Sequence, residues 1–216
     1  MKKVALIVAG GKGVRMKSDI PKQFLLLNKI PILMHTLSAF SFLDQIILIL
    51  PENLFDYWKD LCKKYNFKQK HTLAKGGLNR FDSVKNGLKK IKTDSIVMIH
   101  DGVRPFISKN QINQLIKKTE KGIGVIPIIP VKNSIRKVTK SNSIHIDRSN
   151  LFEVQTPQSF LSSDIKTAYT QDFSEIFTDD ATVFEYYGGK ITSILGEERN
   201  LKITTKIDLT IAKELI

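Results

Sequence analysis

Runs of apolar, largely β-branched residues recur along the chain and alternate with stretches that have the period of amphipathic helices. Buried strands are predicted over 4–8, 45–50, 95–100 and 122–129. Helices are predicted between them over 31–40, which starts at a proline, and over 54–65, 79–91 and 108–120. Strands that are apolar along their whole length need helices on both faces, so the pattern indicates an α/β fold with a mostly parallel central sheet.

The pattern changes after Pro130. Polar and apolar residues alternate over 134–138 and 143–148, on either side of a polar turn, which predicts a projecting β-hairpin arm over about 131–150. The apolar positions of such an arm must be buried on a neighbouring subunit or on the chain's own core. Beyond the arm we expect helices over 163–170 and 179–187, strands at 191–195 and around Lys202, and a last helix from about 206. No repeat or linker is visible, and we interpret 1–216 as a single domain.

The composition is that of a globular protein, with 42% hydrophobic and 25% charged residues, and it excludes disordered and fibrous classes. The formal net charge of +13 favours an anionic partner, which the charge alone does not identify, and a solvated basic surface without a ligand is the alternative. Cys62 is the only cysteine, which excludes an intramolecular disulfide. The apolar run at the start of the sequence is too short for a membrane span or a signal peptide, so we expect a cytoplasmic protein.

A glycine-rich segment, AGGKGVRM, directly follows the first predicted strand, and PKQF comes after it. Glycines allow successive backbone N–H groups to point at a phosphate, while Arg15 and Lys22 are spaced to bracket a triphosphate. Neither the P-loop pattern nor the dinucleotide fingerprint fits this segment. We predict a triphosphate-binding loop; an ordinary turn between a strand and a helix is the alternative. The loop residues are Ala9, Gly10, Gly11, Lys12 and Gly13.

A second segment, GGLNRFDSV, starts with Gly76 and Gly77 and runs into an amphipathic helix. Paired glycines allow close backbone approach to a flat base, with Ser83 supplying a polar contact to its edge. A plain loop with Asn79 as the helix N-cap explains the same residues equally well.

Charged residues mark two further positions. Asp101 follows a buried strand, at the sheet edge where α/β proteins bind ligands, and it is a candidate for ribose hydroxyls or magnesium. A structural ion pair between Asp101 and Arg104 is the alternative. Lys202 lies between Leu201 and Ile203 in a predicted apolar strand, where it needs an anion unless the strand is a solvated edge. The sequence contains no H-E-x-x-H or G-x-S-x-G motif, which leaves zinc catalysis and nucleophilic triads unsupported.

Taken in order, AGGKGVRM, PKQF, GGLNRFDSV, HDGVRPF, IPVKNSIRKV, DRSNLFEVQTPQSF, FTDDATVFEYYGG and NLKITT resemble the 2-C-methyl-D-erythritol 4-phosphate cytidylyltransferases of the non-mevalonate isoprenoid pathway over nearly the whole chain. The resemblance implies a Rossmann-like nucleotidyltransferase fold and a homodimer with interlocking hairpin arms. It also implies a reaction in which CTP and a sugar-alcohol phosphate give a CDP-linked product and pyrophosphate. Neither nucleic acid nor a membrane is an expected partner.

The resemblance also implies roles for individual residues. Arg15 and Lys22 correspond to the cations that stabilise the transition state at the α-phosphorus, and Gly10 to Gly13 lie along the phosphates. Gly76, Gly77 and Ser83 correspond to the cytosine segment, and Asp101 to a residue near the ribose and a magnesium ion held mainly by CTP. Arg148, supplied by the partner subunit, and Lys202 correspond to the pair that positions the methylerythritol phosphate, with Arg104, Ser134 and Thr156 as secondary contacts.

One segment departs from the family pattern. Asn133 and Ser134 stand where many members have Asp-Thr, which keeps a hydroxyl but removes a charge. Ribitol-5-phosphate cytidylyltransferase is therefore the alternative enzyme, although IPVKNSIRKV and FTDDATVFE are more similar to the methylerythritol enzymes. A non-catalytic nucleotide-binding or nucleic-acid-binding protein is the alternative from another class, because it explains the charge and the glycine loop without chemistry.

Overall fold

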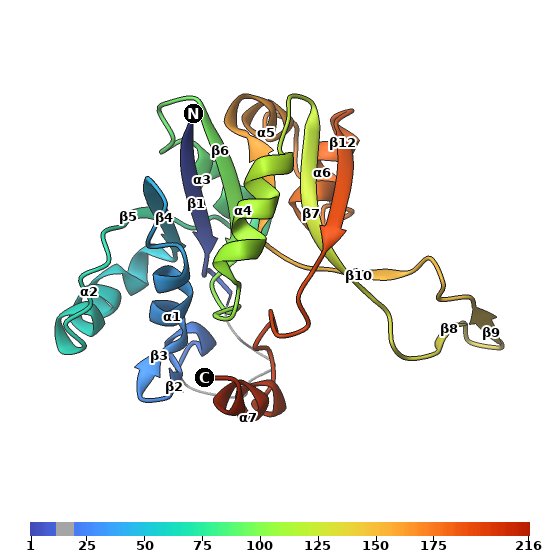
Figure 1. Ribbon diagram of the computed structural model, residues 1–216, viewed down its shortest axis with the longest axis horizontal. Coiled ribbons are helices and arrows are strands. Elements are labelled where there is room, and N and C mark those ends of the chain that lie inside the picture. The colour runs from blue at the N-terminus through green and yellow to red at the C-terminus, as the bar shows by residue number, and fades with distance from the viewer. Residues whose placement is uncertain (12–19) are drawn as a thin grey trace.

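The computed structural model describes residues 1–11 and 20–216, and in this part of the chain eight strands form one sheet (Figure 1). The strand order is β10-β7-β11-β6-β1-β4-β5, and β12 also pairs with β7. Neighbours among β6, β1, β4 and β5 are parallel, as are β12 and β7, whereas β10 and β11 are antiparallel to their partners. The strands are β1 (Lys2–Val8), β4 (Gln45–Leu50), β5 (Thr72–Lys75), β6 (Ser95–Asp101), β7 (Ile123–Pro130), β10 (Phe152–Val154), β11 (Gln158–Leu161) and β12 (Lys190–Leu195). The predicted α/β fold with a mostly parallel sheet is confirmed.

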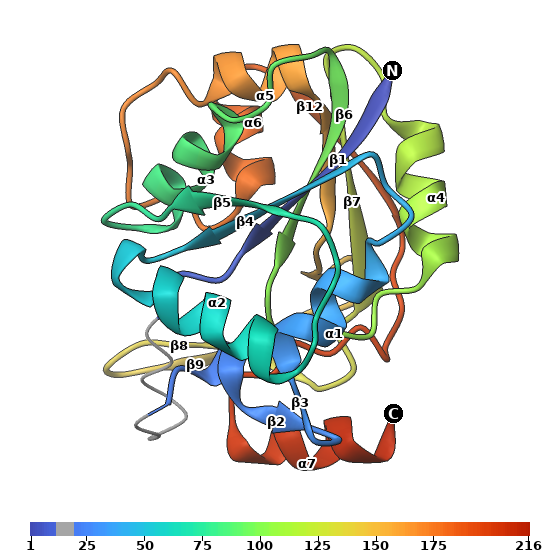
Figure 2. The same ribbon diagram turned by 90° about the vertical axis from the view of Figure 1, so that its left-hand side faces the viewer.

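Helices cover both faces of the sheet because alternate side chains of each apolar strand point to opposite faces. In β1, Val4 and Leu6 pack with α3, α5 and α6, whereas Ala5 and Ile7 pack with α1, α2 and α4. Figure 2 shows α3, α5 and α6 on one side of the sheet and α4 on the other. The helices are α1 (Ile32–Ala39), α2 (Phe55–Lys64), α3 (Arg80–Leu88), α4 (Lys109–Lys118), α5 (Ser162–Ala168), α6 (Asp180–Tyr186) and α7 (Lys206–Glu214).

Side-chain caps fix where three of these helices begin. Asn79 accepts a hydrogen bond from the backbone N–H of the third residue of α3, Ser108 does so for α4, and Asp179 for α6. The N-cap expected at Asn79 is confirmed. The remaining short elements are the 3-10 helices η2 (Lys22–Phe24) and η3 (Glu52–Leu54) and the strand pair β2 (Leu26–Leu27) and β3 (Ile30–Pro31). No helix in the described part of the chain is long and apolar enough to cross a membrane.

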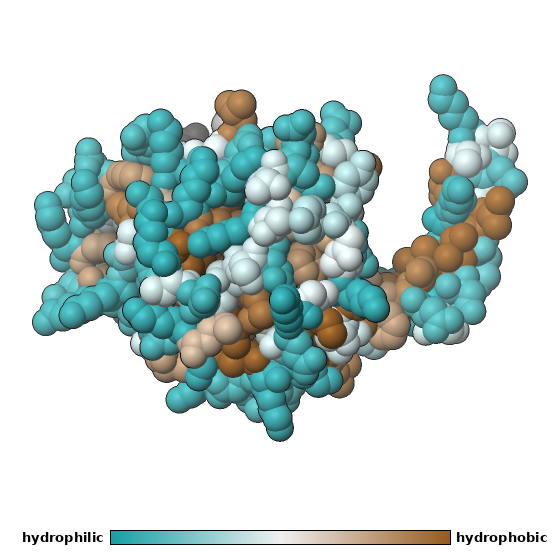
Figure 3. Space-filling view, turned by 90° about the horizontal axis from the view of Figure 1, so that it is seen from above, coloured by the Kyte–Doolittle hydropathy of each residue, from teal (hydrophilic) through white to brown (hydrophobic). Residues whose placement is uncertain are grey.

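The predicted hairpin arm projects from the sheet between β7 and β10 (Figure 1). Its strands β8 (Ile135–Val138) and β9 (Ser143–Ile146) pair antiparallel, with Ile135 opposite Ile146. Seen from above, the arm extends well clear of the body and carries apolar side chains along its length (Figure 3). Val138 is 71% exposed and Ile144 is 52% exposed, so these apolar positions are not buried on the chain's own core.

One expectation from the sequence is wrong, and three strands were not expected. Residues 201–204 form no strand; they lie in an irregular connection that leads into α7. Strands β5, β10 and β11 were not predicted, because β5 and β10 are short and β11 opens with two buried polar residues, Gln158 and Ser159. Buried polar positions hide a strand from an analysis of apolar patterns.

Candidate active site

A cavity of about 690 Å³ opens at the carboxyl ends of β1, β4 and β6. Parallel strands end at the same edge of the sheet, so the turns that follow them meet there, which is where open α/β sheets bind ligands. Its lining comes from the turn after β1, the start of η2, the connections after β4 and before α3, the end of β6 and the segment before α7: Val8, Ala9, Gly10, Gly11, Pro21, Lys22, Gln23, Pro51, Asn53, Leu54, Gly77, Leu78, Asn79, Arg80, Ser83, Asp101, Val103 and Lys202.

The turn before α3 forms one wall of this cavity and is held by Ser83. The Ser83 hydroxyl accepts the Gly77 N–H at 2.9 Å and donates to the Asn79 carbonyl at 2.8 Å. A side chain at Gly77 would lie 2.2 Å from the Asp82 Cβ, so only glycine fits this close approach to the helix. The cap at Asn79 and the predicted base-binding surface coexist, because the cap is what holds the glycine turn against the cavity.

The glycine loop adjoins this turn. A Cβ placed on Gly10 would be 3.8 Å from the Ser83 hydroxyl, so the two segments predicted to bind one nucleotide lie side by side and line the same cavity. The buried Gln23 donates to the Ala9 carbonyl at 2.8 Å, which ties η2, and with it Lys22, to the end of β1. Lys12, Gly13 and Arg15 lie outside the described residues.

Asp101 is the last residue of β6 and pairs with two cations. Its Oδ2 lies 2.9 Å from Lys202 Nζ and 3.3 Å from Arg104 Nε. Burial opposes the charge of this carboxylate, but Lys202, Arg80 and Arg104 outweigh that cost and hold the pKa of Asp101 well below its ordinary range. The predicted pair with Arg104 is confirmed, and it leaves the carboxylate at the cavity wall. Lys202 does meet an anion, although it does so from an irregular segment rather than from a strand.

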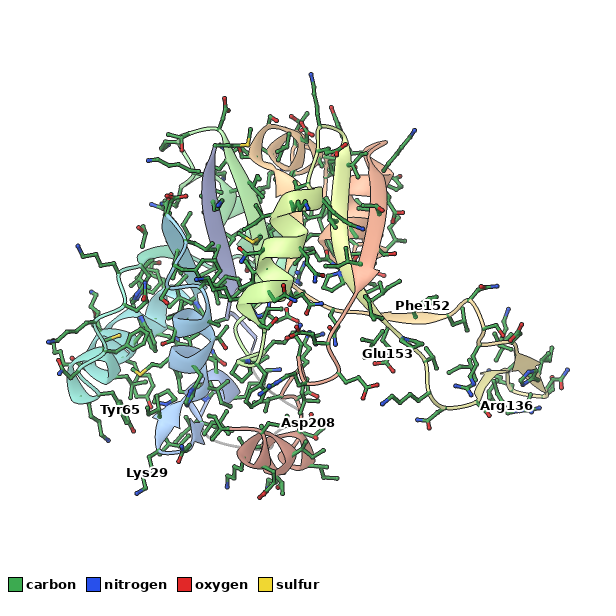
Figure 4. All side chains as sticks on the ribbon, viewed as in Figure 1. Lys29, Tyr65, Arg136, Phe152, Glu153 and Asp208 are labelled. Atoms are coloured by element: carbon green, nitrogen blue, oxygen red, sulfur yellow. The ribbon has the colours of Figure 1, made fainter. Side chains whose placement is uncertain are left out.

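Several hydrogen bonds to its main chain position the segment that carries Lys202. The Ile203 N–H donates to the Val103 carbonyl at 3.0 Å, and Arg104 Nη1 donates to the Asn200 carbonyl at 2.8 Å. Asp208, at the start of α7, accepts the backbone N–H groups of residues 204 and 205 (Figure 4). The capping box of α7 therefore fixes the loop whose lysine reaches the cavity.

A buried histidine orients the residues around Asp101. His100 Nε2 contacts the Arg104 carbonyl at 3.0 Å and must donate to it, so Nδ1 accepts the Thr156 hydroxyl proton at 3.0 Å. The Thr156 oxygen in turn accepts the Asp101 N–H at 3.1 Å. Burial lowers the pKa of His100 to about 4, so the imidazole is neutral at physiological pH. The Thr156 hydroxyl donates its proton to His100, so towards a ligand it can act only as a hydrogen-bond acceptor.

A second, smaller cavity of about 360 Å³ lies on the other side of the same wall. It is lined by residues of β10, β11, the segment before α6 and the wall itself: Arg80, Asp101, Arg104, Val154, Gln155, Thr156, Gln158, Thr178, Asp179, Thr182 and Lys202. Asp101, Lys202 and Arg80 line both cavities. Two ligands bound in the two cavities would therefore meet at these three side chains.

Ser134 and Arg148, expected at the substrate phosphate, lie on the hairpin arm and line neither cavity of this chain. Arg148 Nη1 donates instead to the carbonyls of Val131 and Lys132, at the root of the arm. Figure 4 shows the direction of the arm, with Glu153 at its root and Arg136 far from the body.

Arg80 is the site residue that the sequence analysis did not single out. Its guanidinium binds the buried carboxylate of Asp180. In the sequence the two residues are 100 positions apart and nothing indicates that they form a pair. The sequence did contain a signal for Arg80, which directly follows the N-cap Asn79 and the paired glycines. A residue in the first turn of a helix whose N-terminus borders a binding site is placed to contact the ligand.

A mostly parallel sheet covered by helices, with a glycine turn and a cation-lined cavity at its carboxyl edge, defines a Rossmann-like nucleotidyltransferase. The sequence model of the family "2-C-methyl-D-erythritol 4-phosphate cytidylyltransferase" matches residues 3–216, and the chain belongs to this family. The resemblance inferred from the sequence is confirmed.

Individual relatives agree with this assignment over nearly all of their length. A 2-C-methyl-D-erythritol 4-phosphate cytidylyltransferase of Azobacteroides pseudotrichonymphae genomovar. CFP2 is 49% identical over 99% of this chain and 98% of its own. The corresponding protein of Phocaeicola vulgatus is 45% identical over all of both chains. Among solved structures, the Francisella tularensis enzyme of that name superimposes with a TM-score of 0.83 at 30% identity over all of both chains. The Anaerococcus prevotii 4-diphosphocytidyl-2C-methyl-D-erythritol synthase gives 0.81 at 29% identity, over 99% of this chain and 96% of its own.

Proposed function

We propose that this protein transfers the cytidylyl group of CTP to 2-C-methyl-D-erythritol 4-phosphate, which gives 4-diphosphocytidyl-2-C-methyl-D-erythritol and pyrophosphate for isoprenoid precursor synthesis. Family membership over residues 3–216 supports the activity. The observation that carries the proposal is the wall of Asp101 and Lys202 between two cavities, because a group transfer needs a donor and an acceptor that meet at one charged surface. A cytoplasmic location belongs to the same proposal.

CTP occupies the larger cavity in this proposal. Its cytosine lies against Gly77 and Ser83, its ribose near Asp101, and its triphosphate along Gly10 and Gly11 toward Lys22; Gly76, also expected at the base, does not line the cavity. Lys12, Gly13 and Arg15, expected at the same phosphates, lie outside the described residues. The close approach of Gly77 to α3 supports the position of the base, since a flat ring needs a wall without side chains.

The acceptor phosphate occupies the smaller cavity, beside Lys202, Arg104 and Thr156. One of its oxygens attacks the α-phosphorus of CTP, a new P–O bond forms, and the bond to the pyrophosphate oxygen breaks. The attacking oxygen is already anionic, so no side chain has to remove a proton. Positioning and charge neutralisation supply the rate, as in other phosphoryl transfers. Thr156 accepts a hydrogen bond from a hydroxyl of the sugar alcohol, because its own hydroxyl proton is donated to His100.

Magnesium fits this site as an ion held mainly by the nucleotide. Among the described residues there is no group of three or more metal-ligating side chains, so a protein-made cage is not present in that part of the chain. Both cations beside Asp101 contact its Oδ2, which leaves Oδ1 as the carboxylate oxygen for a hard divalent cation. Mg²⁺ on CTP would supply further neutralisation of the phosphates.

A homodimer completes the proposal. The arm exposes apolar side chains at Val138 and Ile144, and a second copy of the chain offers them a surface. In such a dimer Arg148 and Ser134 reach the acceptor cavity of the partner subunit. This arrangement explains why neither residue lines a cavity in its own chain.

The test is pyrophosphate release from CTP and magnesium with methylerythritol 4-phosphate and ribitol 5-phosphate compared in parallel. Turnover on the first acceptor alone is expected. Turnover on ribitol 5-phosphate alone would overturn the substrate and the pathway, and Asn133 and Ser134 are the residues that make this second candidate worth testing. CTP binding without turnover on either acceptor would favour the non-catalytic alternative.

A further inference from the structure

Arg80 is held in an unusual way for a residue that faces a cavity. It is the first residue of α3. Both terminal nitrogens of its guanidinium donate hydrogen bonds to the carboxylate of Asp180 at the start of α6, with Nη1 2.9 Å from Oδ1. Asp180 is fully buried, and Tyr169 donates its hydroxyl to the same Oδ1 at 2.6 Å. A carboxylate fixed from two sides fixes the arginine in turn.

The pair leaves part of the guanidinium available. Burial opposes the charge, but Asp180 and its hydrogen bonds outweigh it and raise the pKa of Arg80 above its ordinary value, so the cation is permanent. Two terminal N–H groups serve Asp180, and the Nε–H and the outer N–H groups have no partner among the described residues. The Arg80 side chain is 29% exposed, whereas Asp180 is not exposed at all. An ion pair that served packing alone would not need to present one member to two cavities.

The position of Arg80 says which ligand groups it faces. With Asp101 and Lys202 it lines both cavities, and its charge helps to lower the pKa of Asp101. Under the proposed cytidylyl transfer, the groups that meet at this wall are the acceptor phosphate and the α-phosphate of CTP. The β- and γ-phosphates are assigned in that proposal to the glycine loop and Lys22.

We propose that Arg80, held by Asp180, is a further catalytic cation that binds oxygens of the reacting phosphates where the two substrates meet. The inference rests on the proposed function. Two phosphates brought together repel each other, and negative charge spreads over the equatorial oxygens of the transferred group in the transition state. A guanidinium already fixed in place stabilises that charge without reorganising. Its contribution therefore appears in the chemical step rather than in the affinity for CTP.

Two variants separate this role from a structural one. Arg80→Met alone would leave Asp180 as an unpaired buried charge, so it is combined with Asp180→Asn, which removes that charge and keeps an oxygen for Tyr169. Arg80→Lys keeps the ion pair and the fold but loses the forked donors. Lys85→Met is the matched control, because it removes a cation from the same helix at a position that lines neither cavity.

The measurements are thermal unfolding, CTP affinity by calorimetry and pyrophosphate release at saturating substrates. We expect both Arg80 variants to bind CTP within about threefold of the unsubstituted protein and to lose about 100-fold in kcat, as oxyanion donors do, while Lys85→Met keeps full activity. A folded Arg80 variant that retains kcat would overturn the inference and leave the proposed function intact. Failure of the unsubstituted protein to turn over either acceptor would remove the proposed function, and the inference with it.

Discussion

Lys202 Nζ lies 2.9 Å from Asp101 Oδ2, and this contact joins the irregular segment before α7 to the end of the central strand β6. The lysine side chain is 40% exposed, so it is paired without being enclosed. Under the proposed function, the acceptor phosphate would meet a cation whose position is set in advance by a carboxylate. Preorganised charge of this kind lowers the cost of reaching the transition state, because the site does not have to order itself during the reaction.

Removing the lysine charge tests this relationship. Lys202→Met keeps the apolar stem but leaves Asp101 with Arg104 as its closest cation, so we expect kcat/KM for the acceptor to fall about 100-fold. Lys206→Met is the control, since Lys206 is an exposed lysine at the start of α7 that lines neither cavity. Steady-state kinetics with circular dichroism on both variants gives the answer, and equal losses in the two variants would contradict a role for Lys202.

The residues differ in how far the sequence could predict them. The strand β1 follows from the sequence alone, since an apolar run predicts a buried strand. The position of Asp101 follows in the same way, because a carboxylate at the end of the apolar run of β6 falls at the edge of the sheet where ligands bind. β11 does not, because Gln158 and Ser159 are buried by partners far along the chain, Asp179 and Thr119. Local patterns do not encode such partners.

The same reason explains the wrong strand around Lys202 and the omission of Arg80. Lys202 does face an anion, but the apolar neighbours that suggested a strand instead anchor a loop, with Ile203 buried against the residues after β6. Arg80 was overlooked because the value of an arginine at a helix start depends on where Asp180 lies in space. The resemblance to the family supplied roles for residues, and only the folded chain shows which side chains share a wall.

The neutral state of His100 predicts how stability depends on pH. Its pKa is about 6.5 when unfolded and about 4 when folded, with burial as the main cause and Asp101 and Arg104 acting in opposite directions. A depressed histidine pKa means that the unfolded chain binds the proton first. Stability is therefore full above pH 6.5 and falls between about 6.5 and 4, by roughly 3 kcal/mol from this one group.

Denaturant unfolding at a series of pH values measures this loss of unfolding free energy. His100→Asn keeps an acceptor for Thr156 and has no titrating ring, so its unfolding free energy is expected to fall less steeply over that range than that of the unsubstituted protein. His145→Asn removes an exposed histidine from the arm and is expected to leave the slope unchanged. Parallel curves for the protein and His100→Asn would show that the imidazole is not held neutral.

Lys22 is expected to act on the transition state. It lines the nucleotide cavity at the start of η2, and Lys22→Ala should reduce kcat at least about 100-fold while CTP affinity changes by less than about tenfold. Lys29→Asn serves as the control: Lys29 lies in the turn between β2 and β3, points away from the body (Figure 4) and does not line the nucleotide cavity, and asparagine tolerates its positive φ of 66°. Single-turnover kinetics beside calorimetry separates the two quantities. An unchanged single-turnover rate would exclude Lys22 from the chemical step.

Mixing two inactive variants tests whether sites are shared between subunits. If Arg148 serves the partner's site, a heterodimer of Arg148→Ala and Lys22→Ala chains has one site with both residues intact and one with neither. Random exchange at equal amounts makes half of the dimers mixed, so activity should recover to about a quarter of the unsubstituted level. Exchange is verified with differently tagged chains. No recovery in a mixture that has exchanged would mean that Arg148 acts within its own chain, where it now contacts the arm's own carbonyls.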